Sequence, residues 1–100
     1  MLLYNVTLIV EDGVAQEFLN WMQEVHIPEV MATGHFLSNR ILRVVDSPNE
    51  GVTFCSQYVA ENIGSYQDYV NNHAATLQKS LNDRYEGRFV AYRTLMEYLD

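Results

Sequence analysis

His26 is the residue whose type and position best suit acid–base chemistry. It follows Met22 by four positions and Leu19 by seven, which places it at the edge of the apolar face of a predicted helix, near the C-terminal end. The partial negative charge of a helix C-terminus favours the protonated imidazole, so a histidine there can carry a proton near neutral pH. This position suits a general acid or base, or an anchor for an anionic ligand. The commoner role of such a histidine is structural, as a cap before Pro28, and both interpretations stay open.

The other two histidines lie outside any metal-binding motif. His73 is on the apolar face of a second predicted helix, between Val70 and Leu77, where a buried neutral histidine with one partner is the common explanation and ligand binding is the alternative. His35 begins a predicted strand and is expected to be exposed. Neither the His-x-x-x-His nor the Cys-x-x-Cys spacing of metal sites occurs. We therefore expect no bound metal and no cofactor.

Arg93, in the last predicted strand, is a candidate for binding an anion. It shares a strand face with Phe89, Ala91 and Leu95, and an arginine among apolar neighbours needs an anionic partner. Glu97 lies two residues further on the same face. An ion pair within the protein or across a dimer is the favoured interpretation, and a carboxylate clamp for a ligand is the alternative.

Polar side chains are also expected on the face of the sheet that carries no helices. They are Asn5, Thr7, Thr53 and Gln57. These side chains would either line a polar pocket or form a hydrogen-bonded seam between two copies of the chain, and the sequence does not separate the two. Cys55 lies among them with no basic neighbour, so it is interpreted as a small packing residue and not as a nucleophile.

The charge balance argues against two classes of partner. Thirteen acidic side chains and six basic ones give a net charge of −7. Such a surface repels phosphate backbones and anionic lipid, and no cluster of lysine and arginine offsets it. Nucleic acid and membranes are therefore not expected as partners.

The N-terminal segment and the cysteine count bear on the compartment. The apolar run at residues 1–10 lacks a basic leader and a small-residue cleavage site, and it stops at Glu11. No apolar run is long enough to span a bilayer. A single cysteine permits no internal disulfide and fits a reducing compartment. We expect a cytoplasmic protein.

The order of hydrophobic periodicities predicts a β-α-β-β-α-β fold. Alternation with a period of two predicts strands at residues 2–10, 35–45, 52–60 and 89–99. Helical spacing predicts a helix in each of the two crossovers. The result is an α+β, ferredoxin-like sandwich, a four-stranded antiparallel sheet with helices on one face. One hundred residues is the size of one domain, so we expect a single domain over residues 1–100.

Both predicted helices contain residues that interrupt a regular helix. Pro28 disfavours the helical conformation of the residue before it, so the first helix is expected to end near His26. A short second turn through Thr33 would follow and close at Gly34 in the left-handed conformation. In the second helix, the weak helix formers at residues 71–72 predict a bend or break.

The sequence resembles a known superfamily in several places. HIPEV at residues 26–30 follows an aromatic-rich helix, and ATGHF stands at residues 32–36. Together with YNVT at residues 4–7 and FVAYRTL at residues 89–95, they resemble the dimeric α/β-barrel superfamily, and most closely an uncharacterised domain-of-unknown-function family within it. The resemblance covers essentially the full length. It implies a ferredoxin-like protomer whose sheet stacks on a partner's sheet to close a barrel-like homodimer, and it implies no activity.

More distant members of this superfamily include cofactor-free oxygenases, small-ring isomerases, decarboxylases and haem-degrading monooxygenases. Their sites lie in the cleft between sheet and helices. The haem-degrading group uses an asparagine on the first strand, a histidine on the second helix and a tryptophan from the middle of the chain. Asn5 and His73 match the first two, but Trp21 is on the first helix and only Tyr58 is a large aromatic residue near the expected place. The resemblance therefore disfavours haem degradation.

Three functions are compatible with these observations. The leading hypothesis is a homodimeric module that binds a small organic ligand in the cleft between the sheet and the first helix, with contacts from Asn5, Trp21, His26, His73 and Arg93. The second is a cofactor-independent oxygenase or isomerase with His26 as acid or base and Asn5 or Arg93 orienting the substrate, by analogy with the superfamily. The third is a purely structural interaction protein.

Overall fold

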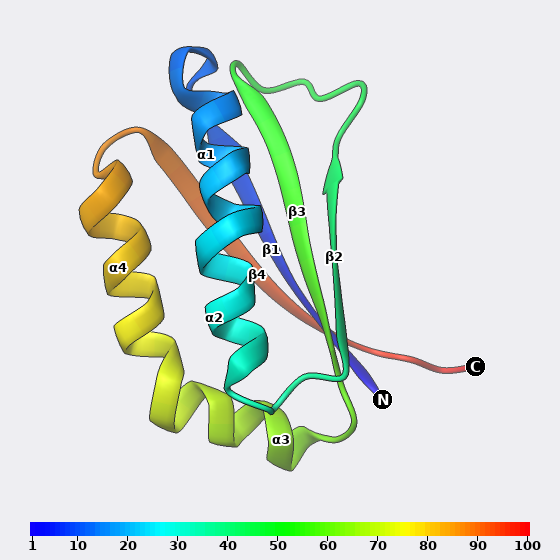
Figure 1. The fold of residues 1–100 in the computed structure, drawn as a ribbon. Coiled ribbons are helices and arrows are strands. Elements are labelled where there is room, and N and C mark those ends of the chain that lie inside the picture. Colours follow the sequence, from blue (N-terminus) through cyan, green and yellow to red (C-terminus); the bar gives the residue numbers. More distant parts are fainter.

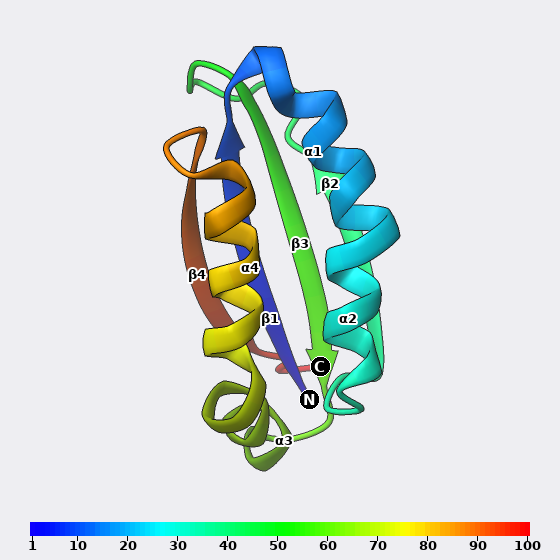
Figure 2. The ribbon, with the colours of Figure 1, turned by 60° about the vertical axis from the view of Figure 1, so that its left-hand side comes forward.

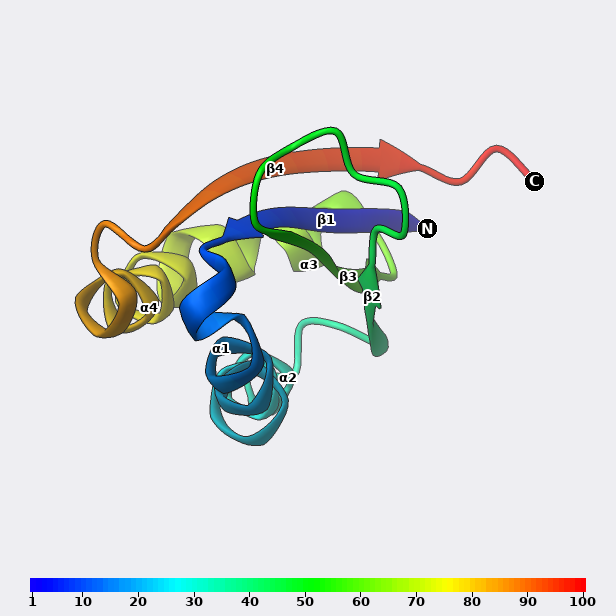
Figure 3. The ribbon, with the colours of Figure 1, turned by 90° about the horizontal axis from the view of Figure 1, so that it is seen from above.

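One antiparallel sheet of four strands forms the centre of the structure, a computed structural model that describes residues 1–100. The strands are β1 (Leu2–Val10), β2 (Ser38–Arg43), β3 (Val52–Ala60) and β4 (Phe89–Glu97), in the spatial order β2-β3-β1-β4. All helices lie on one face of this sheet, as the view from above shows (Figure 3). The prediction of an α+β, ferredoxin-like fold is confirmed.

Strand β1 determines which side chains face the helices. It pairs with both β3 and β4, so each of its residues has a partner on either side. Tyr4, Val6, Leu8 and Val10 are buried under the helices, as the alternation predicts, while the residues between them face the open side. Tyr4 is paired with Tyr58 of β3, and Val6 with Arg93 of β4. Residues far apart in sequence thereby share the helix-covered face.

The first crossover is one continuous helical rod and does not end at His26. It consists of η1 (Asp12–Val14), α1 (Ala15–Trp21), the π-helical turn η2 (Met22–His26) and α2 (Ile27–Ala32). The π-helical turn accommodates the proline. In this turn the amide of Ile27 donates to the Met22 carbonyl, five residues back. Pro28 then lies in the first turn of α2, where a residue without an N–H is tolerated. The prediction that this helix ends near His26 is wrong, whereas Gly34 takes the left-handed conformation expected of it, with φ of 80°.

The second crossover also contains a π-helical turn. It consists of α3 (Ile63–Tyr69), η3 (Val70–Ala74) and α4 (Ala75–Tyr85). The Asn62 side chain caps its start by accepting a bond of 2.9 Å from the amide of Ser65. Figure 1 shows α3 and α4 meeting at an angle, so the bend predicted at residues 71–72 falls within η3.

The open face of the sheet combines a polar centre with apolar margins. Exposed apolar side chains on this face are Leu42, Val90, Tyr92 and Met96. Between them, Asn5 accepts a bond of 3.2 Å from Gln57 and donates one of 2.9 Å to Thr7.

Among the helices of this chain, none combines the length and the apolarity needed to cross a membrane.

Candidate functional site

A small cavity lies between the sheet and the two helical crossovers. Figure 2 shows the two crossovers side by side, with β3 visible between them. The volume of the cavity that the centre of a water molecule can occupy is about 20 Å³, so the cavity has room for about one water. Most of the lining is apolar. The polar and aromatic side chains that reach the cavity are Tyr4, His26, Ser56, Tyr58, Tyr69, Gln78 and Arg93.

Three strands and both crossovers supply these side chains. Tyr4 comes from β1, Tyr58 from β3 and Arg93 from β4, all on the helix-covered face because of their register. The two π-helical turns flank the site: His26 is the last residue of η2, and Tyr69 is the residue before η3. π-Helical turns are frequent at functional sites, because the extra residue shifts side chains out of the regular helical positions.

The tyrosines form one packed cluster around Tyr4. The ring centroid of Tyr4 lies 6.0 Å from that of Tyr58 and 6.2 Å from that of Tyr69. The Ser56 hydroxyl donates a bond of 3.0 Å to the Tyr58 hydroxyl. Burial raises the pKa of Tyr58 to about 12 and also raises the pKa values of Tyr4 and Tyr69, so all three hydroxyls are protonated at neutral pH. They can therefore donate hydrogen bonds to a ligand.

His26 is a neutral, buried imidazole. Its exposed fraction is 7%, and its Nδ1 is buried without a hydrogen-bond partner. Burial, followed by the positive charge of Arg93, lowers the pKa of His26 to about 4. The expectation of a protonated histidine at a helix C-terminus is wrong, because the helix continues to Ala32 and its C-terminal dipole lies beyond His26.

Trp21 stacks on the ring of His26. The two rings stack with centroids 5.4 Å apart, and the Arg84 guanidinium lies 5.4 Å from the centre of the indole. Trp21 also meets the edge of Tyr85 on α4, at 5.7 Å. Trp21 does not line the cavity; it separates His26 from solvent between the two crossovers.

Arg93 faces the cavity without an anionic partner. The two ion pairs of the protein join Lys79 to Asp83 and Arg88 to Glu11, so the predicted pairing of Arg93 with Glu97 does not occur within the chain. The Arg93 charge acts on the cavity groups instead, and it opposes the rise that burial causes in the pKa values of Tyr4 and Tyr69.

Two of the predicted ligand-binding residues lie elsewhere. Asn5 is on the open face, on the other side of the sheet from His26. His73 packs against His35, with ring centroids 5.3 Å apart, and against Tyr69 at 6.4 Å. No group of three or more histidine, cysteine, aspartate or glutamate side chains is arranged to hold a metal. The structure therefore brings His26 and Arg93 to one cavity, with Trp21 behind His26.

Sequence reasoning did not assign the tyrosines or Gln78 to the site. The alternation of β1 does place Tyr4 on the helix-covered face, so that residue had a signal. Tyr69 and Gln78 had none, because their orientation depends on the π-helical turn between them.

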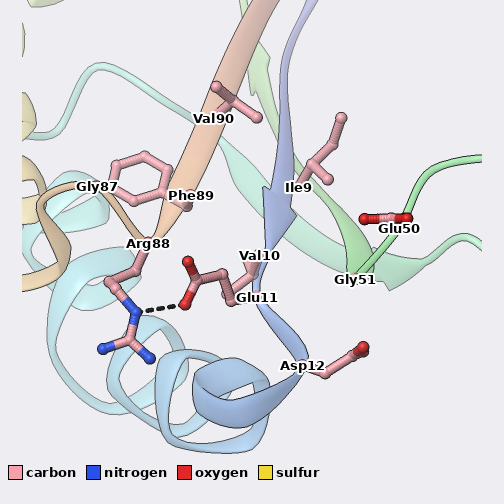
Figure 4. Close-up of a pocket in the computed structure, with 10 residues that line it drawn as sticks. All are labelled: Ile9, Val10, Glu11, Asp12, Glu50, Gly51, Gly87, Arg88, Phe89 and Val90. Atoms are coloured by element: carbon pink, nitrogen blue, oxygen red, sulfur yellow. Dashed lines mark hydrogen bonds and ion pairs between the residues drawn. The ribbon is translucent and has the colours of Figure 1, made fainter.

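A larger hollow of about 390 Å³ lies at one end of the sheet, but its charged groups do not converge. Figure 4 shows the Glu11 carboxylate directed at Arg88, whose charge it neutralises, while Asp12 points away. This hollow is open to solvent and contains no unpaired buried polar atom. The cavity beside His26 is therefore the better candidate.

Comparison with models of protein families shows to which family the chain belongs. The family described as domain of unknown function DUF4286 matches residues 1–99. The chain belongs to this family. No curated protein matches the sequence.

Solved structures similar to this DUF4286 protein have the ferredoxin-like fold of dimeric α/β-barrel proteins. SnoaB, a cofactor-independent oxygenase from Streptomyces nogalater, has a TM-score of 0.70 at 12% identity over 99% of this chain and 94% of that one. An ethyl tert-butyl ether d (EthD) family protein from Bacillus halodurans has a TM-score of 0.69 at 16% identity over 99% and 100%. A dimeric ferredoxin-like protein from an uncultured marine organism has a TM-score of 0.65 at 16% identity, over 97% of this chain and 96% of that one. At these identities the likeness shows the fold alone.

Proposed function

We propose that this DUF4286 protein is a homodimeric, cytoplasmic module that binds a small organic ligand in the cavity between the sheet and the first helix, with residues 1–100 acting as one domain. The observation that carries the proposal is the buried Nδ1 of His26, which has no partner within the chain. A buried polar atom without a hydrogen bond costs about 1–3 kcal/mol. A polar group in the cavity that His26 lines is the available source of a partner.

The remaining lining suits an organic molecule. Protonated tyrosine hydroxyls and Arg93 supply donors, while a neutral His26 supplies one donor and one acceptor. The cavity has room for about one water, so a larger ligand must move the helices away from the sheet as it binds.

The open face of the sheet supports the homodimer. Leu42, Val90, Tyr92 and Met96 leave apolar area exposed around the bonded polar side chains of Asn5, Thr7 and Gln57. An exposed apolar area around a self-satisfied polar centre is typical of an interface between copies. The dimeric ferredoxin-like structure among the similar proteins is consistent with this assembly.

A cofactor-independent oxygenase or isomerase is the second candidate, and its support is the fold shared with SnoaB together with a neutral His26 in a cavity. A neutral imidazole can accept a proton at pH 7, but its remaining N–H makes it a much weaker general acid than the protonated ring. A pKa near 4 also makes it a weak base, which favours binding over catalysis.

Native mass spectrometry of the protein as purified tests the proposal. We expect a dimer that carries additional mass, with loss of that mass in His26→Leu and retention in the control His35→Leu, whose side chain lies outside the cavity. A monomer contradicts the assembly. A dimer that carries no mass and takes up none after incubation with a metabolite extract contradicts ligand binding and favours the structural interaction protein.

A further inference from the structure

Gln78 and Arg93 occupy a boundary position in the fold. Both line the buried cavity beside His26, and both also line an open groove of about 450 Å³ between α4 and β4. The chain turns directly from α4 into β4 at Gly87 (Figure 1), and the residues of this turn and of the two elements line the groove. Only these two side chains belong to both spaces. The groove therefore adjoins the cavity, and the side chains of Gln78 and Arg93 stand between the two.

The charges around this boundary are unbalanced. Arg93 belongs to neither ion pair of the protein, and the groups it faces in the cavity are neutral tyrosines and a neutral His26. Glu86 is the one acidic side chain of the groove, and it makes no ion pair with Arg93. Arg93 is exposed to solvent, so its guanidinium is accessible to an anion that comes through the groove, and a carboxylate matches its planar donors.

The remaining lining defines the rest of the ligand. Beyond Arg93 the cavity is mostly apolar, and the packed rings of Tyr4, Tyr58 and Tyr69 are part of its lining. A single cation with no helix N-terminus beside it suits a monoanion better than a phosphate, which usually gathers several donors. The net charge of −7 repels acids at long range, but salt screens that field within about 10 Å at 0.1 M, whereas contact with Arg93 persists.

We propose that the ligand of this site is a small organic acid with an apolar or aromatic body, which enters between α4 and β4 and places its carboxylate on Arg93. Its body lies among the tyrosines, next to His26. This inference rests on the proposed function and adds the ligand class, the anion-binding residue and the route of entry.

Matched pairs of probes that differ only in charge test the ligand class. The pairs are acetate and acetamide, benzoate and benzamide, and 2-naphthoate and 2-naphthamide, titrated into the full chain while the His26 imidazole signals are followed by NMR. We expect at least one acid to shift His26 with an affinity about tenfold or more above that of its amide. Arg93→Gln should remove this preference, whereas Arg40→Gln, which changes an arginine that lines neither the cavity nor the groove, should keep it.

The outcomes separate this inference from the proposed function. Equal affinity for the acid and the amide of each pair, or an unchanged preference in Arg93→Gln, overturns the ligand class and leaves the binding site intact. If no probe of either kind shifts His26, both proposals are overturned. For the route, Gln78→Trp should slow association of the acid several-fold. Thr76→Trp, at a position of α4 that lines neither the cavity nor the groove between α4 and β4, should not; equal rates would overturn entry between α4 and β4.

Discussion

The indole of Trp21 lies against the imidazole of His26, with the ring planes 29° apart and the centroids 5.4 Å apart. The two residues belong to adjoining turns of one helical rod, α1 and the π-helical turn η2. Because Trp21 lies outside the cavity, its contact keeps water from His26 without filling the binding space. The low pKa of His26 therefore depends on a residue that a ligand does not need to touch.

Trp21→Ala is expected to raise the pKa of His26 from about 4 towards its ordinary value of 6.5, since removing the indole lets water reach the imidazole. An NMR titration of the His26 ring measures the change. The same substitution should lower the free energy of unfolding by about 2 kcal/mol, less than for a fully buried tryptophan. Val25→Ala, at an exposed position of the same π-helical turn, is the control and should leave the pKa of His26 unchanged. An unshifted pKa of His26 in Trp21→Ala would mean that the other residues packed around His26 exclude water from it without Trp21.

His26 should make the protein less stable in acid. Its pKa is about 4 when folded and 6.5 in the ordinary, unfolded reference, so between these values the unfolded chain binds more protons. The stabilisation is complete above pH 6.5 and is lost as the pH falls towards 4, with a total on the order of 3 kcal/mol. His26→Gln cannot protonate, so urea unfolding from pH 4 to pH 7 should show a smaller loss than wild type. Parallel curves for the two proteins would argue that His26 is hydrated when folded.

The strands could be predicted from the sequence, whereas the set of helical side chains that face the sheet could not. Alternation fixed the inward side chains of β1, β3 and β4 because a strand has a side-chain period of two, whatever its partners. Each π-helical turn adds one residue and shifts every later position. Buried Met22 and Ile27 are five residues apart, as are buried Tyr69 and Ala74, and these spacings were the available signals.

The wrong predictions about the site follow from these shifts in which helical side chains face the sheet. Regular spacing put Val70 on the buried face, yet it is exposed and Tyr69 points inward instead. Ending the first helix at His26 predicted a protonated imidazole, but the continuing rod buries it in neutral form. The position of Arg93 on the helix-covered face follows from strand alternation. The side chain nevertheless stays exposed to solvent there, so the partner that the sequence predicted for it is not required.

Ser56→Ala should destabilise the protein by about 1–2 kcal/mol, because it leaves the buried Tyr58 hydroxyl without the 3.0 Å bond it accepts. The double variant Ser56→Ala/Tyr58→Phe removes both partners and should recover much of that loss. Chemical denaturation of wild type, both single variants and the double variant gives the coupling energy directly. Additive effects would mean that the two hydroxyls are satisfied independently, by water in the cavity.

Tyr92→Glu should convert the dimer to a monomer. Tyr92 stands on the open face of β4, opposite Thr7 in the register, and its exposed fraction of 60% makes it one of the largest apolar contacts available to a partner sheet. A second copy stacked on this face would bury a carboxylate from each copy, and the cost of desolvating these charges opposes association. Light scattering after size exclusion at matched concentrations measures the mass. Val45→Glu, at a position 92% exposed beyond the end of β2, is the matched control and should remain dimeric. A dimer that survives Tyr92→Glu with unchanged affinity would assign the interface to another surface.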